Sequence, residues 1–334
     1  MSARYLGDQN KVGMFAESGT YANPTGTVLQ WLGLVQNHTI EDLRASMQIR
    51  TEGAGTRNIS QTVYTTNDYN GTITYYPQDF RMLGFALGSF FSTSGPNCSH
   101  IVTETNSDTG NAFTSGTKAP FISFTIQDSK KSPTTNKHFI RTLNGATINS
   151  LNVSWAQGEP LTCEVNYIAQ QLIRSSGAAA AVTADTLRPL LWKDVKVHIP
   201  SGTTYPTTAG TFAINNNLEG RHVTNGSQEI DLPIPLNRDY SVSLTMDTAD
   251  DTTNTLYDYF QFGSSFNMML EIDGTTTAVG SRSTYIVFSG CNLVTSSQPS
   301  PMTGINEDTF TVIPTTCNAK SYDRIGTIGK WGGW

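Results

Sequence analysis

The chain has 334 residues, of which 37% are hydrophobic and only 14% are charged, and its formal net charge is −6. Average soluble domains carry about 25% charged residues. The negative balance argues against a general nucleic-acid-binding protein, which would present a basic face. No apolar run reaches the length of a membrane helix, and residues 1–11 lack the apolar segment of a secretory signal. The length fits about two domains or one large all-β domain.

The polar part of the composition points to β-structure. Thr, Ser and Asn occur 47, 30 and 24 times and together make up about 30% of the chain. Thr favours half-buried pleated surfaces, whereas Ser and Asn favour turns. The chain is therefore predicted to be all-β, with a polar surface that carries little charge.

In chain order, residues 1–28 are polar and punctuated by glycine, and we expect an extended N-terminal arm. A first β domain is expected over 29–170. Residues 39–49 fit either a helical stripe or a strand, and a strand is favoured because a Gly-rich turn and a further strand at 59–64 follow. Asn70-Gly71 is a turn signal that opens an alternating strand at 72–76.

A short helix is predicted from about 77–79 to Gly88, because the segment begins with Asp79 and ends in glycine. Residues 92–120 are rich in Ser, Thr and Gly and predict a long loop. Strands are then expected at 121–126, 139–143, 148–155 and 161–168, with turns at Gly145 and Gly158. This spacing is typical of sandwiches and barrels.

Residues 171–205 are rich in small side chains and predict a linker, after which 206–300 predict a second β half. That half has an alternating strand at 240–245 and a second short helix at 256–260 that ends near Gly263. The order of elements repeats that of the first half, although the intervals differ. The repeat predicts a duplication, but an unduplicated all-β chain can also give such matches.

The side chains that could carry chemistry form no catalytic or metal-binding pattern. Four cysteines, at 98, 163, 291 and 317, form no CxxC pair and are expected to be buried free thiols. The histidines have no zinc-binding spacing. Asp250 and Asp251 could bind calcium, but a role at the start of the second helix is favoured. Glu41 and Asp42 are adjacent on a strand and face opposite sides. No enzyme, cofactor or metal site is predicted.

Four residues are candidates for contacts between subunits. Arg57 and Arg221 lie at corresponding turns of the two halves, where each could pair with a neighbouring subunit or only lie over its own strand. Trp331 and Trp334 stand among glycines in the C-terminal segment, 301–334. Because free tryptophans would expose a large apolar area, this tail is expected to dock on its own body or on a neighbour.

Several segments carry a resemblance to a known family. These are 52–57 (EGAGTR), 70–75 (NGTITY), 79–88 (DFRMLGFALG), 141–151 (RTLNGATINSL) and 158–161 (GEPL). Over about 37–296 the sequence resembles the tail tube (major tail) proteins of tailed bacterial and archaeal viruses. The resemblance implies β-sandwich or partial-barrel domains, each with a flanking helix.

The resemblance also implies that the protein has a structural role in the virion and is made in the host cytoplasm. Such domains join sheets edge to edge into rings of six, and stacked rings conduct viral DNA without specific binding. Two domains per chain would give trimeric rings with pseudo-six-fold symmetry, and one domain would need six chains. Other tail proteins would be the further partners. Two other classes stay open: a capsid, decoration or baseplate protein, and a secreted adhesin or carbohydrate-binding module.

Overall fold

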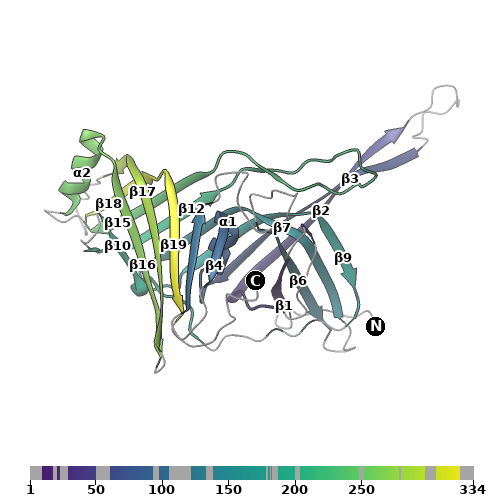
Figure 1. Cartoon of the computed structure of the whole chain (residues 1–334), viewed down its shortest axis with the longest axis horizontal. Coiled ribbons are helices and arrows are strands. Elements are labelled where there is room, and N and C mark those ends of the chain that lie inside the picture. The colour runs from purple at the N-terminus through teal and green to yellow at the C-terminus, as the bar shows by residue number, and fades with distance from the viewer. Residues whose placement is uncertain are drawn as a thin grey trace.

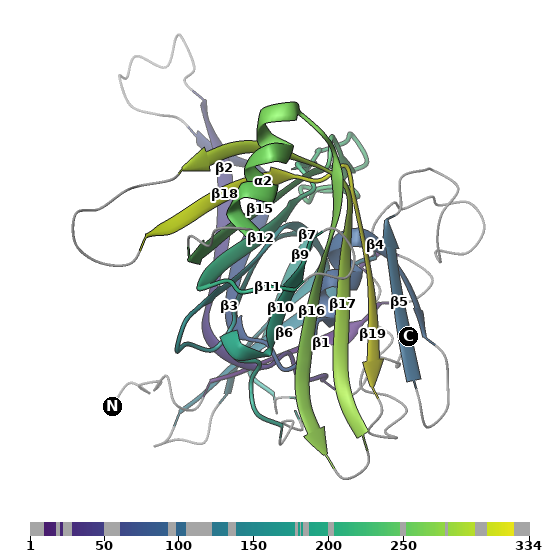
Figure 2. The same cartoon turned by 90° about the vertical axis from the view of Figure 1, so that its left-hand side faces the viewer.

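The computed structural model describes residues 10–17, 21–22, 29–49, 61–92, 98–104, 122–132, 138–177, 180, 182, 187–199, 204–247, 252–277, 280–297 and 306–323. Antiparallel strands dominate it, and two α-helices lie beside them. The all-β prediction with one short helix per half is confirmed. Figure 1 shows two halves along the long axis, with α1 (Arg81–Leu87) between them and α2 (Thr252–Phe262) at one end, and Figure 2 views the molecule from the α2 end.

The first half is a two-sheet unit in which one long strand belongs to both sheets. Strand β7 (His138–Ala156) pairs through its first part with β6 (Phe124–Lys131) and β9 (Gln171–Ser175). Its second part pairs with β8 (Thr162–Ala169). Strand β1 (Lys11–Ala16) extends the first sheet beyond β6. Strands β3 (Gln61–Tyr76) and β2 (Leu34–Ile49) extend the second sheet beyond β8.

The second half has the same pairings in the same order. Strand β17 (Gly280–Ser297) pairs first with β16 (Phe266–Thr277) and β19 (Thr316–Asp323), and then with β18 (Glu307–Ile313). Strand β10 (Val195–His198) extends the first of these sheets beyond β16. Strands β15 (Asp239–Asp247) and β12 (Ala209–Asn215) extend the second beyond β18.

The register of the two halves is also the same. The β7–β8 pairs Thr147↔Ile168 and Ser150↔Asn166 recur in β17–β18 as Asn292↔Ile313 and Thr295↔Thr311, each residue 145 positions later. The irregularity between the pairs recurs as well, at Ile148/Ser150 and Leu293/Thr295. A chain without an internal repeat has no physical reason to reproduce a register and its bulge together.

Where each shared strand passes from one sheet to the other, a glycine takes a left-handed conformation. Gly145 has φ 68° and Gly290 has φ 58°, which costs glycine little because it has no Cβ. The residue opposite each corner bonds in the same way, Gln170 N–H to Asn144 O at 3.0 Å and Thr315 N–H to Ser289 O at 3.0 Å. The turn expected at Gly145 is therefore a corner inside a strand.

A hairpin of β4 (Gly88–Ser92) and β5 (Cys98–Glu104) follows α1, and the second half has no counterpart of it between α2 and β16. Strand β5 pairs with β19 and so ties the two halves together. The prediction of a structureless loop over 92–120 is thus wrong for the part that forms β5. Its weakly apolar sequence forms a strand because β4 and β19 supply hydrogen-bonding partners on both sides.

Shorter elements complete the structure: the 3₁₀-helix η2 (Trp192–Asp194), β11 (Thr204–Tyr205), β13 (Leu218–Glu219) and β14 (Ile234–Pro235). The range 171–205, expected as a linker, includes β9 and β10. The range 1–28, expected as an arm, includes β1, where Val12, Met14 and Phe15 are buried. The expected turn at Asn70-Gly71 is wrong, because both residues lie within β3.

Candidate functional site

The two halves meet where β7 of the first half pairs with β12 of the second. The register runs from Ser150↔Asn215 to Ala156↔Ala209. We call the first sheet of each half its outer sheet and the second its inner sheet. The β7–β12 pairing joins the two inner sheets into one sheet of eight strands, in the order β2-β3-β8-β7-β12-β15-β18-β17. We call the β7–β12 pairing and its surroundings the seam. At the seam a Cβ on Gly210 would lie 2.3 Å from Cζ2 of Trp155, so the indole ring occupies the space that a side chain would need.

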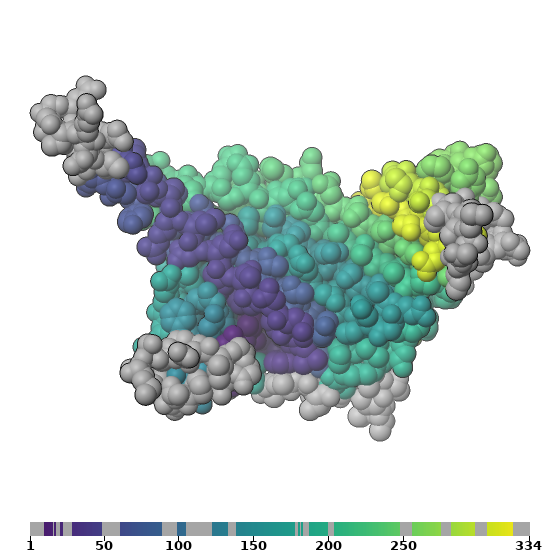
Figure 3. Space-filling model, turned by 180° about the vertical axis from the view of Figure 1, so that it is seen from behind, coloured from purple at the N-terminus to yellow at the C-terminus, as the bar shows by residue number. Residues whose placement is uncertain are grey.

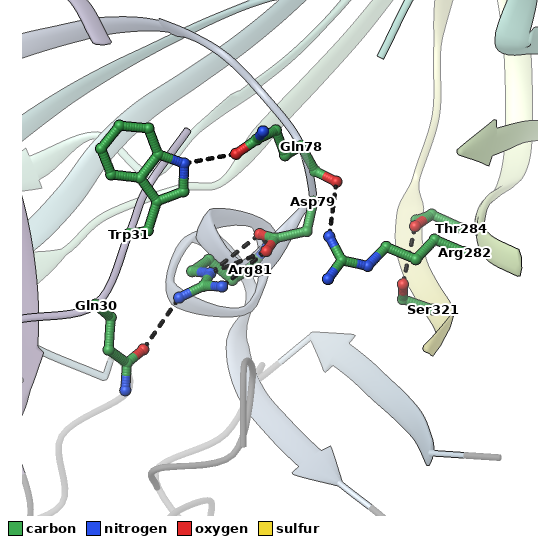
Figure 4. Close-up of polar contacts among 8 residues, drawn as sticks. All are labelled: Gln30, Trp31, Gln78, Asp79, Arg81, Arg282, Thr284 and Ser321. Atoms are coloured by element: carbon green, nitrogen blue, oxygen red, sulfur yellow. Dashed lines mark hydrogen bonds and ion pairs between the residues drawn. The ribbon is translucent and has the colours of Figure 1, made fainter. Parts of the chain in front are cut away.

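Polar contacts hold the first half against the second beside α1 (Figure 4). Arg282 of β17 donates through Nη1 to the backbone oxygen of Gln78, at 3.4 Å. The Gln78 side chain accepts from Trp31 Nε1 at 2.5 Å. Arg81 pairs with Asp79 at 2.7 Å, and both side chains are buried. Such a buried pair is held by its hydrogen bonds, and removing one partner would leave a buried charge.

Further hydrogen bonds join the two halves at two places. Asn216, which follows β12, donates through Nδ2 to Ala86 O of α1 at 3.0 Å and to Ile148 O at 2.9 Å. The connection from β12 to β15 also runs back over the hairpin of β2 and β3 (Figure 1). There Asn67 N–H donates to Gln228 O at 2.8 Å, and Gln228 Nε2 donates to Tyr64 O at 2.9 Å.

The two faces of the eight-stranded sheet differ in chemistry. Strands alternate side chains between faces, and one face is buried, for example at Ile73, Val165 and Leu244. The other, which we call the open face, carries mainly hydroxyl and amide side chains. Several of these bond to one another across strands: Thr72 Oγ1 to Asn166 Oδ1 at 2.6 Å, and Asn166 Nδ2 to Ser150 Oγ at 3.0 Å.

The charges on the open face are all negative. Alternation places six carboxylates on this face that are not buried: Glu41, Asp68, Glu164, Asp239, Asp247 and Glu307. Of these, Asp68 pairs with His222 of the β12–β15 connection at 2.9 Å. Among the residues that the structure describes in these eight strands, no Lys, Arg or His has the same orientation. A polyanion would find neither a salt-bridge partner nor a basic patch on this face.

The sheet ends in two strand edges. Within the described residues, β2 pairs only with β3, and the second part of β17 pairs only with β18. An unpaired edge offers N–H and C=O groups to another strand. The hairpin of β2 and β3 projects beyond the body, as Figure 3 shows, and Leu43, Met47 and Tyr64 on it are exposed.

The four sequence-predicted contact residues are not brought together by the described structure. Arg57, Trp331 and Trp334 lie outside the described residues. Arg221 is exposed and pairs with exposed Glu219 at 3.3 Å, a contact of small energetic value. Its role between subunits stays a prediction.

The thiols that the structure describes are buried, and the side chain of Cys98 lies outside the described residues. Cys163, Cys291 and Cys317 are free and buried, as expected. Burial raises the pKa of Cys163 to about 12 and that of Cys291 to about 11. Burial also lowers the pKa of His38 to about 4, and His38 Nε2 lies 2.8 Å from the Tyr167 hydroxyl. The described residues include no cluster of three metal-ligand side chains and no helix able to span a membrane.

Sequence reasoning missed the seam and the open face. The alternation of Thr, Ser and Asn with apolar residues was visible, for example in 72–76 and 240–245. Alternation assigns residues to two faces, but it does not say which strands are neighbours. Gly210 was a visible signal, since glycine inside a strand often marks a close approach.

Comparison with known protein families agrees with this architecture. The family model for phage tail tube proteins matches residues 8–317. No curated protein matches the sequence. The matched range includes the first two-sheet unit, the second unit up to the start of β19, the seam and both free edges of the inner sheet. The chain therefore belongs to the phage tail tube proteins, structural components of the virion tail.

Proposed function

We propose that three copies of this chain close into a ring of pseudo-six-fold symmetry, and that stacked rings form the conduit for viral DNA. The observation that supports it most directly is the seam. Within one chain, β7 of one two-sheet unit pairs with β12 of the next. The equivalent strands on the outer ends of the chain are β17 and β2, which have no such partner within the described residues.

The repeat gives the register of the contact between chains. Each β7 residue corresponds to the β17 residue 145 positions later, and each β12 residue to the β2 residue 172 positions earlier. Pairs of the seam thus translate into Glu41↔Ser297, Asp42↔Ser296 and Leu43↔Thr295 between neighbouring chains. Such a head-to-tail contact is heterologous and closes when the rotation allows.

Barrel size favours three chains. Three chains contribute twenty-four strands, eight from each. At strand spacings near 4.8 Å these give a barrel about 37 Å across the backbone, and strand tilt widens it. A DNA duplex fits such a lumen. Six chains of the same sheet would give a barrel about twice as wide.

The open face is the lumen wall in this proposal. Its carboxylates repel DNA phosphates, and its hydroxyl and amide groups partly bond to one another. DNA binding depends on neutralising phosphates with Lys and Arg, so a wall without these side chains lets DNA slide. The projecting β2–β3 hairpin is suited to contact the next ring.

Disulfide trapping tests the ring. A Glu41→Cys/Ser297→Cys chain should form cross-linked trimers under oxidation, seen on non-reducing gels, and top-view microscopy should show six-lobed rings of three chains. The matched control Ala45→Cys/Ser297→Cys moves one thiol four residues along the hairpin and should not cross-link. Rings of six chains, or equal cross-linking of both pairs, would refute the proposed contact.

Labelling tests the lumen. A gold-cluster maleimide on Thr72→Cys should appear inside assembled tubes by electron microscopy. The same label on Asn318→Cys, on the outer sheet, should appear outside. Label from Thr72→Cys on the tube exterior would show that the open face is not the lumen.

A further inference from the structure

The second helix exposes an aromatic surface that its counterpart in the first half buries. Each helix ends at a glycine in the left-handed conformation, Gly88 with φ 90° and Gly263 with φ 61°. Counting back from these glycines, Met82, Phe85 and Leu87 of α1 correspond to Tyr257, Phe260 and Phe262 of α2. The α1 residues are 1%, 4% and 0% exposed, whereas the α2 residues are 40%, 39% and 72% exposed.

The exposed surface is not caused by a loosely attached helix. On its other face α2 packs against its own half through Leu256, which is buried, and through Tyr259, whose ring lies 4.9 Å from that of Phe266. Tyr257 and Phe260 contact each other, with ring centroids 6.1 Å apart. A monomer would leave this aromatic cluster in water, which is costly and favours association.

The cover over α1 shows what α2 lacks. Part of it comes from the β4–β5 hairpin, which the second half does not have. Its own half contributes β7 and Phe124 of β6, whose ring centroid lies 4.8 Å from that of Phe85. From across the seam come β19 and the Asn216 bond to Ala86 O. Helix α2 lies at one end of the long axis (Figure 1), and the described residues form no further two-sheet unit beyond it.

We propose that a second copy of the chain covers the α2 aromatic cluster, through the outer sheet of its first half. This inference rests on the proposed ring. The counterpart of β19 is β9, which pairs only with β7 within the described residues. Strand β9 exposes Ile173, an apolar side chain that suits the aromatic cluster, whereas the adjacent Arg174 already pairs with Asp42.

Geometry within one chain supports a second copy as the occupant. Helix α2 and strand β9 lie at opposite ends of the long axis (Figure 1), so one molecule cannot bring them together. Successive chains joined head to tail bring α2 of one chain and β9 of the next together at every contact. The C-terminal segment is a less suitable cover, because β19 runs away from α2 and so ends on the side far from it (Figures 1 and 2).

Isotope-coded photo-cross-linking tests the contact. A chain with p-benzoylphenylalanine in place of Phe262 is prepared with ¹⁵N, mixed with an equal amount of unlabelled chain and assembled. We expect cross-linked peptides that combine both isotopes and map to Gln171–Ser175 or its surroundings. Cross-links confined to one isotope, including any to residues 324–334, would overturn the inference.

Substitution gives the strength of the contact. Phe260→Ser/Phe262→Ser should raise the concentration needed for ring assembly at least tenfold, since two aromatic side chains lose their cover. The control Leu236→Ser removes an exposed side chain, 58% accessible, that is not part of α2, and should change the assembly concentration less than twofold. Equal behaviour of the two variants would overturn the inference.

The edge disulfide separates the two proposals. If Glu41→Cys/Ser297→Cys rings form and the photo-cross-linker at position 262 captures no neighbour within them, the ring stands and the α2 contact fails. If no rings form and no edge disulfide appears, the proposed function fails as well.

Discussion

Gly210 gives the sharpest test of the seam. In Gly210→Ala the new methyl would lie 2.3, 2.7 and 2.9 Å from Cζ2, Cε2 and Cη2 of Trp155. Non-bonded carbons prefer about 3.5–4.0 Å, so the indole or the β12 backbone must move by roughly 1 Å. Trp155 is buried in the core, where such overpacking costs about 1–3 kcal/mol. Because the bulky indole is buried and has little room to move, we expect the upper half of that range.

Thermal unfolding measures the loss. Gly210→Ala should lower the Tm by roughly 3–4 °C, from about 2.1 cal/mol/K of unfolding entropy per residue. Gly177→Ala is the matched control, because the nearest atom to its Cβ is Ser175 Oγ at 3.5 Å, and it should change the Tm little. Trp155→Phe replaces the indole with a smaller ring and makes room for the new methyl group. The loss of stability in Gly210→Ala/Trp155→Phe should therefore be smaller than the sum of the losses in the two single variants. Additive losses, or a Gly210→Ala chain as stable as Gly177→Ala, would refute the close approach.

Three further predictions concern buried polar groups. Glu17→Gln should destabilise the chain by about 2–4 kcal/mol in thermal unfolding, because the buried carboxylate accepts from Gly145 N–H at 2.7 Å and Thr125 Oγ1 at 2.6 Å; an unchanged Tm would contradict this anchoring. Cys163 and Cys291, with pKa values of about 12 and 11, should resist alkylation at pH 8 until the chain unfolds, and peptide mass spectrometry would reveal native labelling if the idea is wrong. For His38, with a pKa of about 4, the unfolded chain binds more protons between pH 6.5 and 4, so stability should fall by up to about 3 kcal/mol as pH drops through that window. His38→Gln should flatten this slope in denaturant titrations, and an unchanged slope would assign it to other groups.

The sequence predicts elements better than it predicts their neighbours. Both helices could be predicted, because a polar start and a terminal glycine are local signals, and Gly88 and Gly263 take the left-handed conformation that such signals require. Gly145 is also predicted to form a turn from its local sequence. It lies instead at a corner inside β7, since a left-handed glycine serves a tight turn and a sheet-to-sheet corner equally well.

Gly71 shows a different limit. Asn-Gly is a strong turn signal, yet Gly71 lies inside β3, where a Cβ would be 2.1 Å from the Tyr167 hydroxyl oxygen and 2.6 Å from Thr39 O. The glycine is needed for space, and that need arises from β8, almost a hundred residues later in the chain. The open face was hidden for the same reason, because its residues come from eight strands spread over both halves.

Only the pairing of the strands shows where the few charged residues of the chain lie. A net charge of −6 is compatible with any distribution, but the eight paired strands place exposed carboxylates on one face together with hydroxyl and amide groups. Joining two units in one chain also affects assembly. The seam forms at an effective concentration set by the covalent link, whatever the protein concentration. Within the proposed ring, the β17–β2 edge and the α2 surface then respond to concentration, which makes ring closure a step at which assembly can be controlled before rings stack.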